Sequence, residues 1–312
     1  MAQIIQKAPG KIILFGEHAV VYGKPAIAVP IMQCYTTVTI QPLIHQHNIV
    51  QIQAPDIGLN CPLAELEPEH PFALIISMVR QLGKLHHLPA MQIHIHSRLP
   101  VAAGLGSGAS VSVALAKALC AFFSIPFTDQ EISDIAFEAE KQYHGTPSGI
   151  DNTVIAFERG IFFQREKPVE WLKIAQPNHI LIVNSGEEKS TKGMVERVRE
   201  QFNHSPQLIQ PLLDQIGEIA VQARSALEIG NPPKLGSLMV QNHQLLQALG
   251  VSTPGLDRMV QLAMENGALG AKLSGAGGGG NMIILMHSAT TAALTQTFAQ
   301  AGYTRQIQTI IQ

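Results

Sequence analysis

Residues 8–28 place three side chains that can do chemistry in an otherwise apolar run interrupted by glycines. Lys11, Glu17 and His18 lie within eight consecutive positions. Burying an ion without a partner costs roughly several kcal/mol, so each of these groups needs a counter-charge or a polar ligand. We interpret the segment as a site for a small polar ligand. The alternative is a solvated loop between two strands.

A second segment, residues 99–110, has the composition of a phosphate-binding loop. Gly104, Gly106 and Gly108 leave the backbone bare at alternate positions, and a helix is predicted to begin directly after them. Free N–H groups at the start of a helix, together with the helix dipole, attract phosphate. Ser107 and Ser110 supply hydroxyls for an anion or a cation. Alternatively, these small residues only allow the helix to pack closely on a sheet.

The third segment, residues 272–281, contains five glycines in six positions. Gly275, Gly277 and Gly280 match the GxGxxG pattern, but a strand rather than a helix is predicted to follow, which excludes a dinucleotide-binding fold. So many glycines cost chain entropy, which implies a backbone that must approach something closely. We expect this loop to lie against phosphates or the reacting oxygen. A flexible hairpin tip is the alternative.

Two carboxylates lie between these glycine-rich segments. Glu140 follows Ala136 by four positions and Ile132 by eight, which places it on the buried side of a predicted helix. A buried acid there needs a cation, either a metal or a lysine. Asp151 follows a stiff turn that contains proline and glycine, at the mouth of a predicted strand, a common place for a catalytic side chain. The alternatives are a structural salt bridge for Glu140 and a turn-closing role for Asp151.

Together these groups form the inventory that phosphoryl transfer requires. Backbone dipoles and a lysine stabilise the phosphate charge, one carboxylate binds Mg²⁺, and another orients the acceptor hydroxyl. The sequence therefore favours an enzyme that moves a phosphoryl group.

The elements that must position these residues alternate between strands and helices. In the first half, alternating or apolar runs predict strands, and Thr128 with Glu131 forms a capping box at the start of a helix. The predicted strands are 12–15, 26–31, 35–40, 48–53 and 90–97, the predicted helices are 71–86, 107–123 and 128–143, and a hairpin is predicted over 153–164.

The second half is predicted to be mainly helical. Its predicted strands are 179–184, 270–273 and 282–286, and its predicted helices are 191–203, 206–229, 232–248, 255–266 and 288–301. Residues 165–178, with two prolines and mixed charge, are the predicted junction. This order of elements predicts an α+β protein with two lobes, which we place at 1–170 and 171–312.

Composition excludes several functional classes. The chain has 312 residues, of which 46% are hydrophobic and 14% charged, with a net charge of -2, unlike a basic nucleic-acid binder. Three widely spaced cysteines form no CxxC pair, so we expect neither disulfides nor a zinc site, and a reducing compartment fits best. No signal peptide is predicted, and the uncharged residues 99–116 contain too many glycines and serines, with a proline, to span a membrane. We expect a cytoplasmic protein without membrane or nucleic-acid partners.

His94 and His96 alternate along a predicted strand and therefore share one of its faces. Two such histidines can ligate a metal. A solvated face opposite inward-facing Ile93 and Ile95 explains them better.

The three segments also resemble a family. Pro9-Gly10-Lys11 with Gly16-Glu17-His18, the Pro100–Ser110 loop and the Gly275–Gly280 tract are similar to the three motifs of the GHMP small-molecule kinases. The resemblance runs from the N-terminus to about residue 285. It implies an N-terminal lobe similar to domain 2 of ribosomal protein S5 and a ferredoxin-like C-terminal lobe.

Within that family, residues 16–26 and 144–152 look like the members that phosphorylate mevalonate. Galactokinases differ, since they usually continue the Gly-Glu-His with Thr-Asp-Tyr. The resemblance thus implies ATP- and Mg²⁺-dependent phosphorylation of the C5 hydroxyl of mevalonate in the route to isoprenoids. A sister kinase acting on phosphomevalonate or another small alcohol stays open, as does a ligand sensor without catalysis. Intact Lys11, Glu140 and Asp151 count against the sensor.

Residue by residue, the resemblance implies the following roles. Asp151 would take or orient the hydroxyl proton, Lys11 would pair with it and stabilise charge on the phosphoryl group, and Glu140 would bind Mg²⁺. Residues implied to line the mevalonate pocket are Glu17, His18 and Thr191. Residues implied to contact ATP are Pro100, Ala103, Gly104, Leu105, Gly106, Ser107, Gly108, Ala109, Gly277 and Gly278.

One position departs from the family pattern. Relatives often carry two serines in the glycine-rich loop, and the second is assigned a metal contact, whereas this chain has Ser107 followed by Gly108. We therefore expect Ser107 or a water molecule to take that place. Family members are often dimers, so a homodimer is a further expectation.

Overall fold

The computed structural model describes residues 2–44, 49–99, 104–144, 147–187 and 191–312. The chain forms two compact units. The first unit contains Met1–Lys11 and Cys34–Glu158, and the second contains Ile12–Gln33 and Arg159–Gln312. This grouping differs from a single cut near residue 170, because residues 12–33 pack with the C-terminal half.

The sheet of the first unit has the strand order β4-β3-β5-β2, and β1 pairs with β2. Strands β3 and β5 are parallel, whereas β2 pairs antiparallel with β5 and β3 with β4. The chain crosses between the units within β1 and within β2. The bounds are β1 (Ile4–Phe15), β2 (Ala26–Pro42), β3 (Val50–Ala54), β4 (Leu59–Pro62) and β5 (Met91–Ser97).

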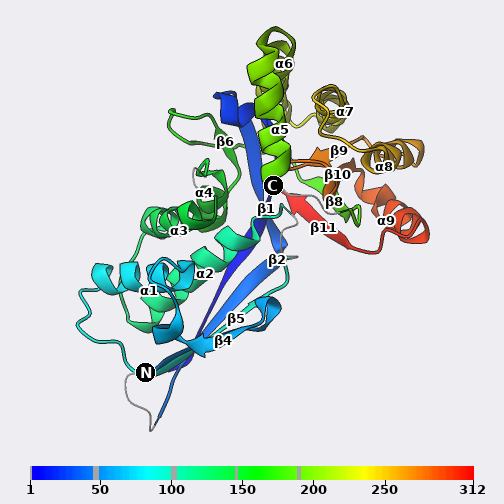
Figure 1. Cartoon of the computed structure of the whole chain (residues 1–312). Coiled ribbons are helices and arrows are strands. Elements are labelled where there is room, and N and C mark those ends of the chain that lie inside the picture. The colour runs from blue at the N-terminus through cyan, green and yellow to red at the C-terminus, as the bar shows by residue number, and fades with distance from the viewer. Residues whose placement is uncertain (1, 45–48, 100–103, 145–146, 188–190) are drawn as a thin grey trace. The chain divides into compact units, whose positions relative to one another are not determined.

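Four helices accompany this sheet: α1 (Pro71–Leu82), α2 (Ser107–Phe122), α3 (Asp129–His144) and α4 (Ile150–Phe157). They cover one face of it (Figure 1). The core between them joins sheet residues such as Ile93 to helix residues such as Val113 and Ile135. The opposite face is polar, and His94 and His96 are exposed there while Ile95 is buried, so the solvated-face interpretation is confirmed.

The second unit contains a four-stranded antiparallel sheet with the order β11-β8-β10-β9. Its strands are β8 (Asn178–Asn184), β9 (Gly270–Ser274), β10 (Asn281–Met286) and β11 (Gln306–Ile311). With helices between β8 and β9 and between β10 and β11, the order along the chain is β-α-β-β-α-β, which is the ferredoxin-like arrangement. The ferredoxin-like prediction is therefore confirmed.

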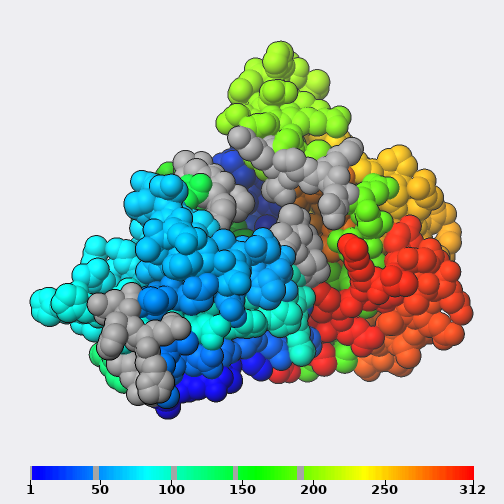
Figure 2. Space-filling model, turned by 60° about the horizontal axis from the view of Figure 1, so that its bottom comes forward, coloured from blue at the N-terminus to red at the C-terminus, as the bar shows by residue number. Residues whose placement is uncertain are grey.

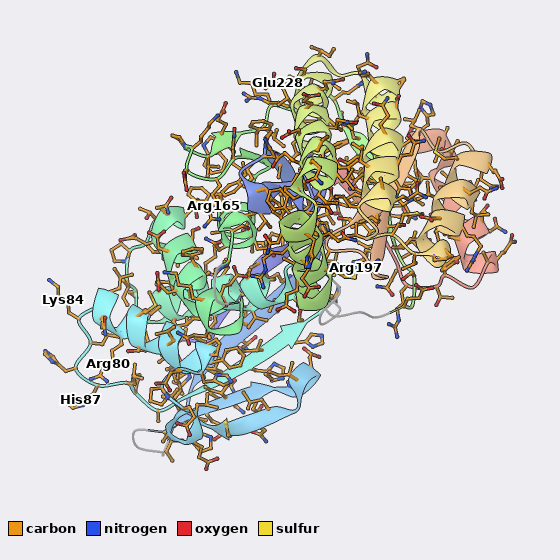
Figure 3. All side chains as sticks on the ribbon, turned by 45° about the horizontal axis from the view of Figure 1, so that its top comes forward. Arg80, Lys84, His87, Arg165, Arg197 and Glu228 are labelled. Carbon is orange, nitrogen blue, oxygen red and sulfur yellow. The ribbon has the colours of Figure 1, made fainter. Side chains whose placement is uncertain are left out.

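The helices of the second unit are α5 (Thr191–His204), α6 (Pro206–Ile229), α7 (Pro232–Ala248), α8 (Pro254–Glu265) and α9 (Thr291–Gln300). All five agree with the predicted helices within a few residues. Figure 2 shows α9 and β11 as one continuous surface, and Gln306 and Gln308 on β11 donate hydrogen bonds to Thr295 of α9. Figure 3 marks Glu228 near the end of α6 and Arg197 on α5.

Short strands β6 (Ile161–Phe163) and β7 (Glu170–Trp171) pair with each other, and β6 pairs with the start of β2.

The prediction of a hairpin over 153–164 was wrong for its first arm, because residues 153–157 belong to helix α4, whereas Ile161–Phe163 form strand β6. The β-branched and aromatic residues of the run indicated a strand, but tertiary contacts outweigh that propensity. Asn152 is buried and donates to the backbone and hydroxyl oxygens of Ser133, and the Thr153 hydroxyl donates to the Gly149 carbonyl. Asp151 accordingly lies in the first turn of a helix and not at the mouth of a strand.

The structure also bears on two expectations, the state of the cysteines and the presence of membrane-spanning helices. Cys34, Cys61 and Cys120 are all free, as expected. Among the residues that the structure describes, no helix combines the length and the apolar character needed to cross a bilayer.

The capping box at the start of α3 is present as predicted. The Thr128 amide donates to Glu131 Oε2 at 2.7 Å, and the Glu131 amide donates to Thr128 Oγ1 at 3.2 Å. We expect Thr128→Ala to lower the free energy of unfolding by about 1 kcal/mol, because an orphan N–H loses its acceptor. Urea denaturation measures this loss. The matched control is Thr290→Ala, because Thr290 is the N-cap of α9 but makes no side-chain capping bond. An equal loss in both variants would contradict the capping account.

Candidate active site

Lys11 and Asp151 meet in the first unit. Lys11 Nζ lies 3.1 Å from Asp151 Oδ1, with side chains that are 6% and 29% exposed respectively. The ammonium also donates to the Gly104 carbonyl at 3.2 Å, and the Lys11 amide donates to the Leu105 carbonyl at 2.9 Å. The lysine thus joins strand β1, the end of the glycine-rich loop and the first turn of α4. A partly exposed carboxylate beside a buried ammonium can accept a proton from a bound hydroxyl.

The glycine-rich loop leads directly into α2. Gly104 and Gly106 both have φ of 73°, a left-handed conformation that favours glycine. A Cβ on Gly106 would lie 2.9 Å from the Lys11 side chain and 3.0 Å from Ile155. Gly106 is the N-cap of α2 and makes no side-chain cap bond, so the first amides of the helix are available to an anion.

The residues predicted to contact ATP have different surroundings. Gly104 and Gly108 are exposed, with nothing within 4 Å of an added Cβ, while Leu105 and Ala109 are buried. Ser107 is half-buried at the start of α2. Pro100 and Ala103 lie outside the described residues.

Ser110 was considered as a hydroxyl for a bound ligand, but its hydroxyl makes hydrogen bonds inside the protein instead. Its hydroxyl oxygen lies 2.9 Å from both the Ala8 carbonyl and Thr36 Oγ1, and it is fully buried. The sequence could not distinguish it from Ser107, since both follow the glycines within a few positions.

Glu140 is buried beside Lys11 and Asp151. It is 6% exposed, and no hydrogen bond to its carboxylate is found among the residues that the structure describes. Burial and the nearby Asp151 charge raise the pKa of Glu140 from 4.5 to about 8, while Lys11 acts in the opposite direction. The prediction that Glu140 faces the buried side of α3 is confirmed. The cluster has two acids and one lysine, so it can hold an additional positive charge.

The second unit contains Glu17, which pairs with a lysine that sequence reasoning left without a role. Lys272 Nζ donates to Glu17 Oε1 and, at 2.6 Å, to the Leu273 carbonyl. Asn242 Nδ2 lies 3.3 Å from the other oxygen, Glu17 Oε2. Glu17 is 1% exposed and the other two side chains are fully buried. The available signal was a lysine inside an otherwise apolar strand, directly before the glycine tract.

His18 has an unusual backbone. Its φ of 59° and ψ of -47°, with the Ala19 amide donating to the Glu17 carbonyl at 2.6 Å, define a γ-turn of the rare, positive-φ kind. Such conformations cost of order 1–3 kcal/mol and persist only where neighbouring contacts enforce them. The His18 ring Nε2 lies 2.9 Å from the Ala276 carbonyl, and burial lowers the pKa of His18, so a neutral ring that donates from Nε2 fits this contact.

The glycine tract is pressed against the protein's own backbone. A Cβ on Gly277 would lie 2.1 Å from the Val251 carbonyl oxygen, and one on Gly279 would lie 2.4 Å from the Glu187 carbonyl oxygen. Gly278 and Gly280 donate their amides to these same two carbonyls, at 2.7 and 2.9 Å. The inference of close approach is correct, but at Gly277 and Gly279 the neighbour is protein.

Thr191, the remaining predicted pocket residue, is the first residue of α5. The surroundings of its side chain lie outside the description. Within the described ranges, no cluster of three or more histidine, cysteine or acidic residues has the arrangement of a metal site.

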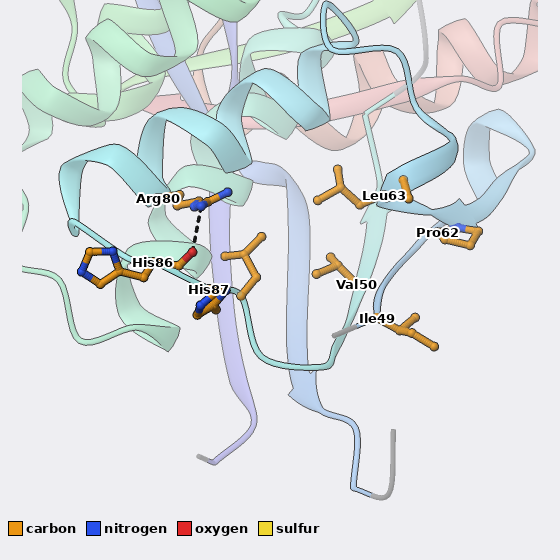
Figure 4. Close-up of a pocket in the computed structure, with 9 residues that line it drawn as sticks. Ile49, Val50, Pro62, Leu63, Arg80, His86 and His87 are labelled. Carbon is orange, nitrogen blue, oxygen red and sulfur yellow. Dashed lines mark hydrogen bonds between the residues drawn. The ribbon is translucent and has the colours of Figure 1, made fainter. Parts of the chain in front are cut away.

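A cavity of about 380 Å³ in the first unit lies away from the motifs, and none of the predicted site residues lines it. Arg80 lies on its wall and donates to the carbonyls of Leu85 and His86, at 3.0 and 2.8 Å (Figure 4). This arginine therefore closes the C-terminal end of α1 and is not a free anion-binding group.

Residues 73–160 match the GHMP kinases N terminal domain, and residues 223–304 match the GHMP kinases C terminal domain. A mevalonate kinase from Thermococcus sibiricus is 36% identical over 302 residues, which cover 91% of this chain and 89% of the relative.

Two solved structures are similar over nearly their whole length. The Methanococcus jannaschii mevalonate kinase has a TM-score of 0.86 and 28% identity, covering 100% of this chain and 99% of that one. The L. major mevalonate kinase in complex with R-mevalonate has a TM-score of 0.83 and 30% identity, covering 99% and 96%.

The contacts of the glycine tract predict a graded response to alanine. Gly277→Ala should lower the free energy of unfolding by about 2–5 kcal/mol, because a backbone oxygen obstructs the new Cβ and φ is positive. Gly275→Ala is the matched control, since its φ is also positive but nothing lies within 4 Å of the added Cβ. We expect it to lose about 1–2 kcal/mol. Urea denaturation of both variants makes the comparison, and similar losses would refute the close approach to Val251.

Proposed function

The chain belongs to the GHMP kinase family, among its mevalonate kinases, and from this premise we propose that it phosphorylates (R)-mevalonate. The reaction transfers the γ-phosphoryl group of ATP to the C5 hydroxyl and yields 5-phosphomevalonate and ADP. The observation that carries this proposal is the 3.1 Å contact between Lys11 Nζ and Asp151 Oδ1 at the end of the glycine-rich loop. This contact places a base and a cation together, as transfer to a hydroxyl requires.

In the proposed mechanism Asp151 accepts the proton of the C5 hydroxyl. The hydroxyl oxygen forms a bond to the γ-phosphorus as the bond from that phosphorus to the β–γ bridging oxygen breaks, and ADP leaves with that oxygen. Lys11 stabilises the negative charge on the transferred group and fixes the Asp151 carboxylate. Its bond to the Gly104 carbonyl holds the lysine in this position.

The ATP phosphates are proposed to bind the exposed backbone at the start of α2. The amides of Ser107, Gly108 and Ala109 begin that helix, and its dipole favours negative charge there. Pro100 and Ala103–Gly106 are proposed to complete the loop. Gly277 and Gly278 are further proposed contacts, by the family resemblance.

A magnesium ion fits the residues present in the first unit. Glu140 is a buried carboxylate with a raised pKa beside Asp151, and oxygen donors of this kind are the ligands that Mg²⁺ prefers. We propose that Glu140 holds the ion, with Ser107 or a water molecule in place of the hydroxyl that Gly108 lacks. When bound, Mg²⁺ supplies positive charge that neutralises the phosphates.

For the acceptor we propose contributions from Glu17, His18 and Thr191. These assignments rest on the resemblance of residues 16–26 to mevalonate-phosphorylating relatives. On composition and the same family resemblance, we also propose that the protein acts in the cytoplasm and forms a homodimer.

An ADP-release assay with ATP and Mg²⁺ tests the substrate. Turnover is expected with mevalonate and not with phosphomevalonate, galactose or homoserine. Turnover with phosphomevalonate alone would keep the phosphoryl chemistry but contradict the acceptor assignment. Bound ATP without turnover on any of the four would instead indicate a sensor.

The role of Asp151 predicts a large catalytic loss in Asp151→Asn. Loss of a positioned base typically lowers kcat by about 10²–10⁴, which the same assay measures. The matched control is Asp129→Asn, which removes an exposed carboxylate from the first turn of another helix, α3. We expect the control to stay within about twofold of wild type, in the range of ordinary surface substitutions. A wild-type kcat in Asp151→Asn would exclude it as the base.

The raised pKa of Glu140 predicts a pH-dependent stability in the absence of divalent metal. Between pH 4.5 and about 8 the native state keeps the Glu140 proton that the unfolded chain has released. The native state then binds more protons, so this group makes the free energy of unfolding fall as pH rises through that window.

Glu140→Gln removes this dependence. The unfolding free energy of wild type minus that of the variant should therefore fall with pH, by at most about 1.4 kcal/mol per pH unit. Urea denaturation in EDTA across the window measures the difference, and Mg²⁺ should restore wild-type stability at the alkaline end. A difference that does not change with pH would show that Glu140 is ionised without metal.

A further inference from the structure

The carboxylate of Glu17 has both of its oxygens bound inside the second unit. Lys272 contacts Oε1 and Asn242 contacts Oε2, and only 1% of Glu17 is exposed. A carboxylate that is held in this way has little capacity left for a substrate hydroxyl. Its effect on a ligand must therefore pass through the residues that it positions.

Burying the ammonium group of Lys272 costs desolvation free energy, which suggests that its charge has a specific role. Lys272 is fully buried in β9, and burial lowers its pKa while Glu17 raises it. A buried ion pair is weak support for stability, since apolar residues of similar volume often do as well. Such a pair is better explained when it fixes a geometry.

The geometry next to this pair is the γ-turn at His18. The turn is closed by the bond from the Ala19 amide to the Glu17 carbonyl, so the residue that Lys272 anchors is also the first residue of the turn. On the other side of the turn the His18 ring contacts the Ala276 carbonyl. A third contact, from Ser274 Oγ to the Ile13 carbonyl at 2.9 Å, joins the same two segments. These contacts together enforce a backbone conformation that would otherwise relax.

We propose that Lys272, assisted by Asn242, is a positioning residue for acceptor binding. It holds the Glu17 carboxylate, and through Glu17 it maintains the strained turn that orients the His18 ring. It does not touch the acceptor. This inference rests on the proposed function, which names mevalonate as the acceptor and assigns His18 to its pocket.

The competing explanation is an ion pair that only stabilises the fold. Removing Lys272 would then reduce stability but would leave the affinity of the folded protein for mevalonate unchanged. A positioning role instead makes the effect of Lys272 on affinity depend on His18. A double-mutant cycle distinguishes these two explanations, because groups that act through one another are not additive.

The experiment measures mevalonate affinity by calorimetry, and KM for mevalonate and for ATP, in the full-length chain. The variants are Lys272→Met, His18→Ala and their combination. Each single variant should weaken mevalonate binding by about tenfold, equivalent to about 1.4 kcal/mol, with the KM for ATP within about twofold of wild type. The combined variant should bind mevalonate at most about threefold less tightly than the single variant with the lower affinity. The reason is that the ring that Lys272 positions is already absent from His18→Ala.

Two controls keep the result interpretable. Glu17→Gln combined with Lys272→Met removes both charges, so it avoids leaving a buried ion unpaired and is expected to fold with its mevalonate KM still raised. Glu228, which Figure 3 labels, pairs with Arg224 on the surface of α6. Glu228→Gln breaks this pair and should change neither KM.

Three results would overturn the proposal. They are additive losses of about 100-fold in the combined variant, a folded Lys272→Met protein with wild-type mevalonate affinity, and a doubly neutral variant that fails to fold or that recovers wild-type KM. A wild-type chain that does not turn over mevalonate at all would instead refute the proposed function.

Discussion

The contact between Lys11 and Asp151 is the interaction on which the candidate site of the first unit depends, because it joins β1, the glycine-rich loop and α4. A buried ammonium must have acceptors around it, and Lys11 finds them in a carboxylate from α4 and a carbonyl from the glycine-rich loop. That requirement fixes the entry to α2, since Gly106 lies so close to the lysine that a Cβ there would touch its side chain. α4 begins after Gly149, whose φ is 85°, and this start places Asp151 in the first turn, within reach of Lys11. The loop, the start of α2 and the base therefore all contact one buried charge.

The second unit applies the same constraint with different residues. Lys272 is fully buried and takes its counter-charge from Glu17, which ties residues 12–18 to β9. The following glycines have no side chains, so their amides reach the carbonyls of Val251 and Glu187. The motif containing Glu17 and His18 and the C-terminal glycine tract are thus held together by charge and by backbone contacts. This coupling explains why residues 12–33 group with the C-terminal half.

Much of this arrangement could be predicted from the sequence where the cause is local. The capping box of Thr128 and Glu131, and the buried side of α3 that carries Glu140, follow from spacing alone. The helix at Ile150–Phe157 could not be predicted, because its β-branched residues favour a strand and only tertiary contacts such as those of Asn152 reverse that preference. The partner of Glu17 was missed because 255 positions separate it from Lys272. The γ-turn at His18 has no sequence signature, since contacts from distant segments enforce it.

The proposed catalysis depends on Lys11 and Asp151 acting as a unit, and a double-mutant cycle on kcat tests this dependence most directly. Lys11→Met, Asp151→Asn and the combination are compared in the same mevalonate assay. If the lysine fixes the base and the base fixes the lysine, the combined variant should lose about as much as the more damaging single variant, as in other catalytic groups that function together. Independent losses that multiply in the combined variant would contradict the account, because the 3.1 Å contact would then have no part in catalysis.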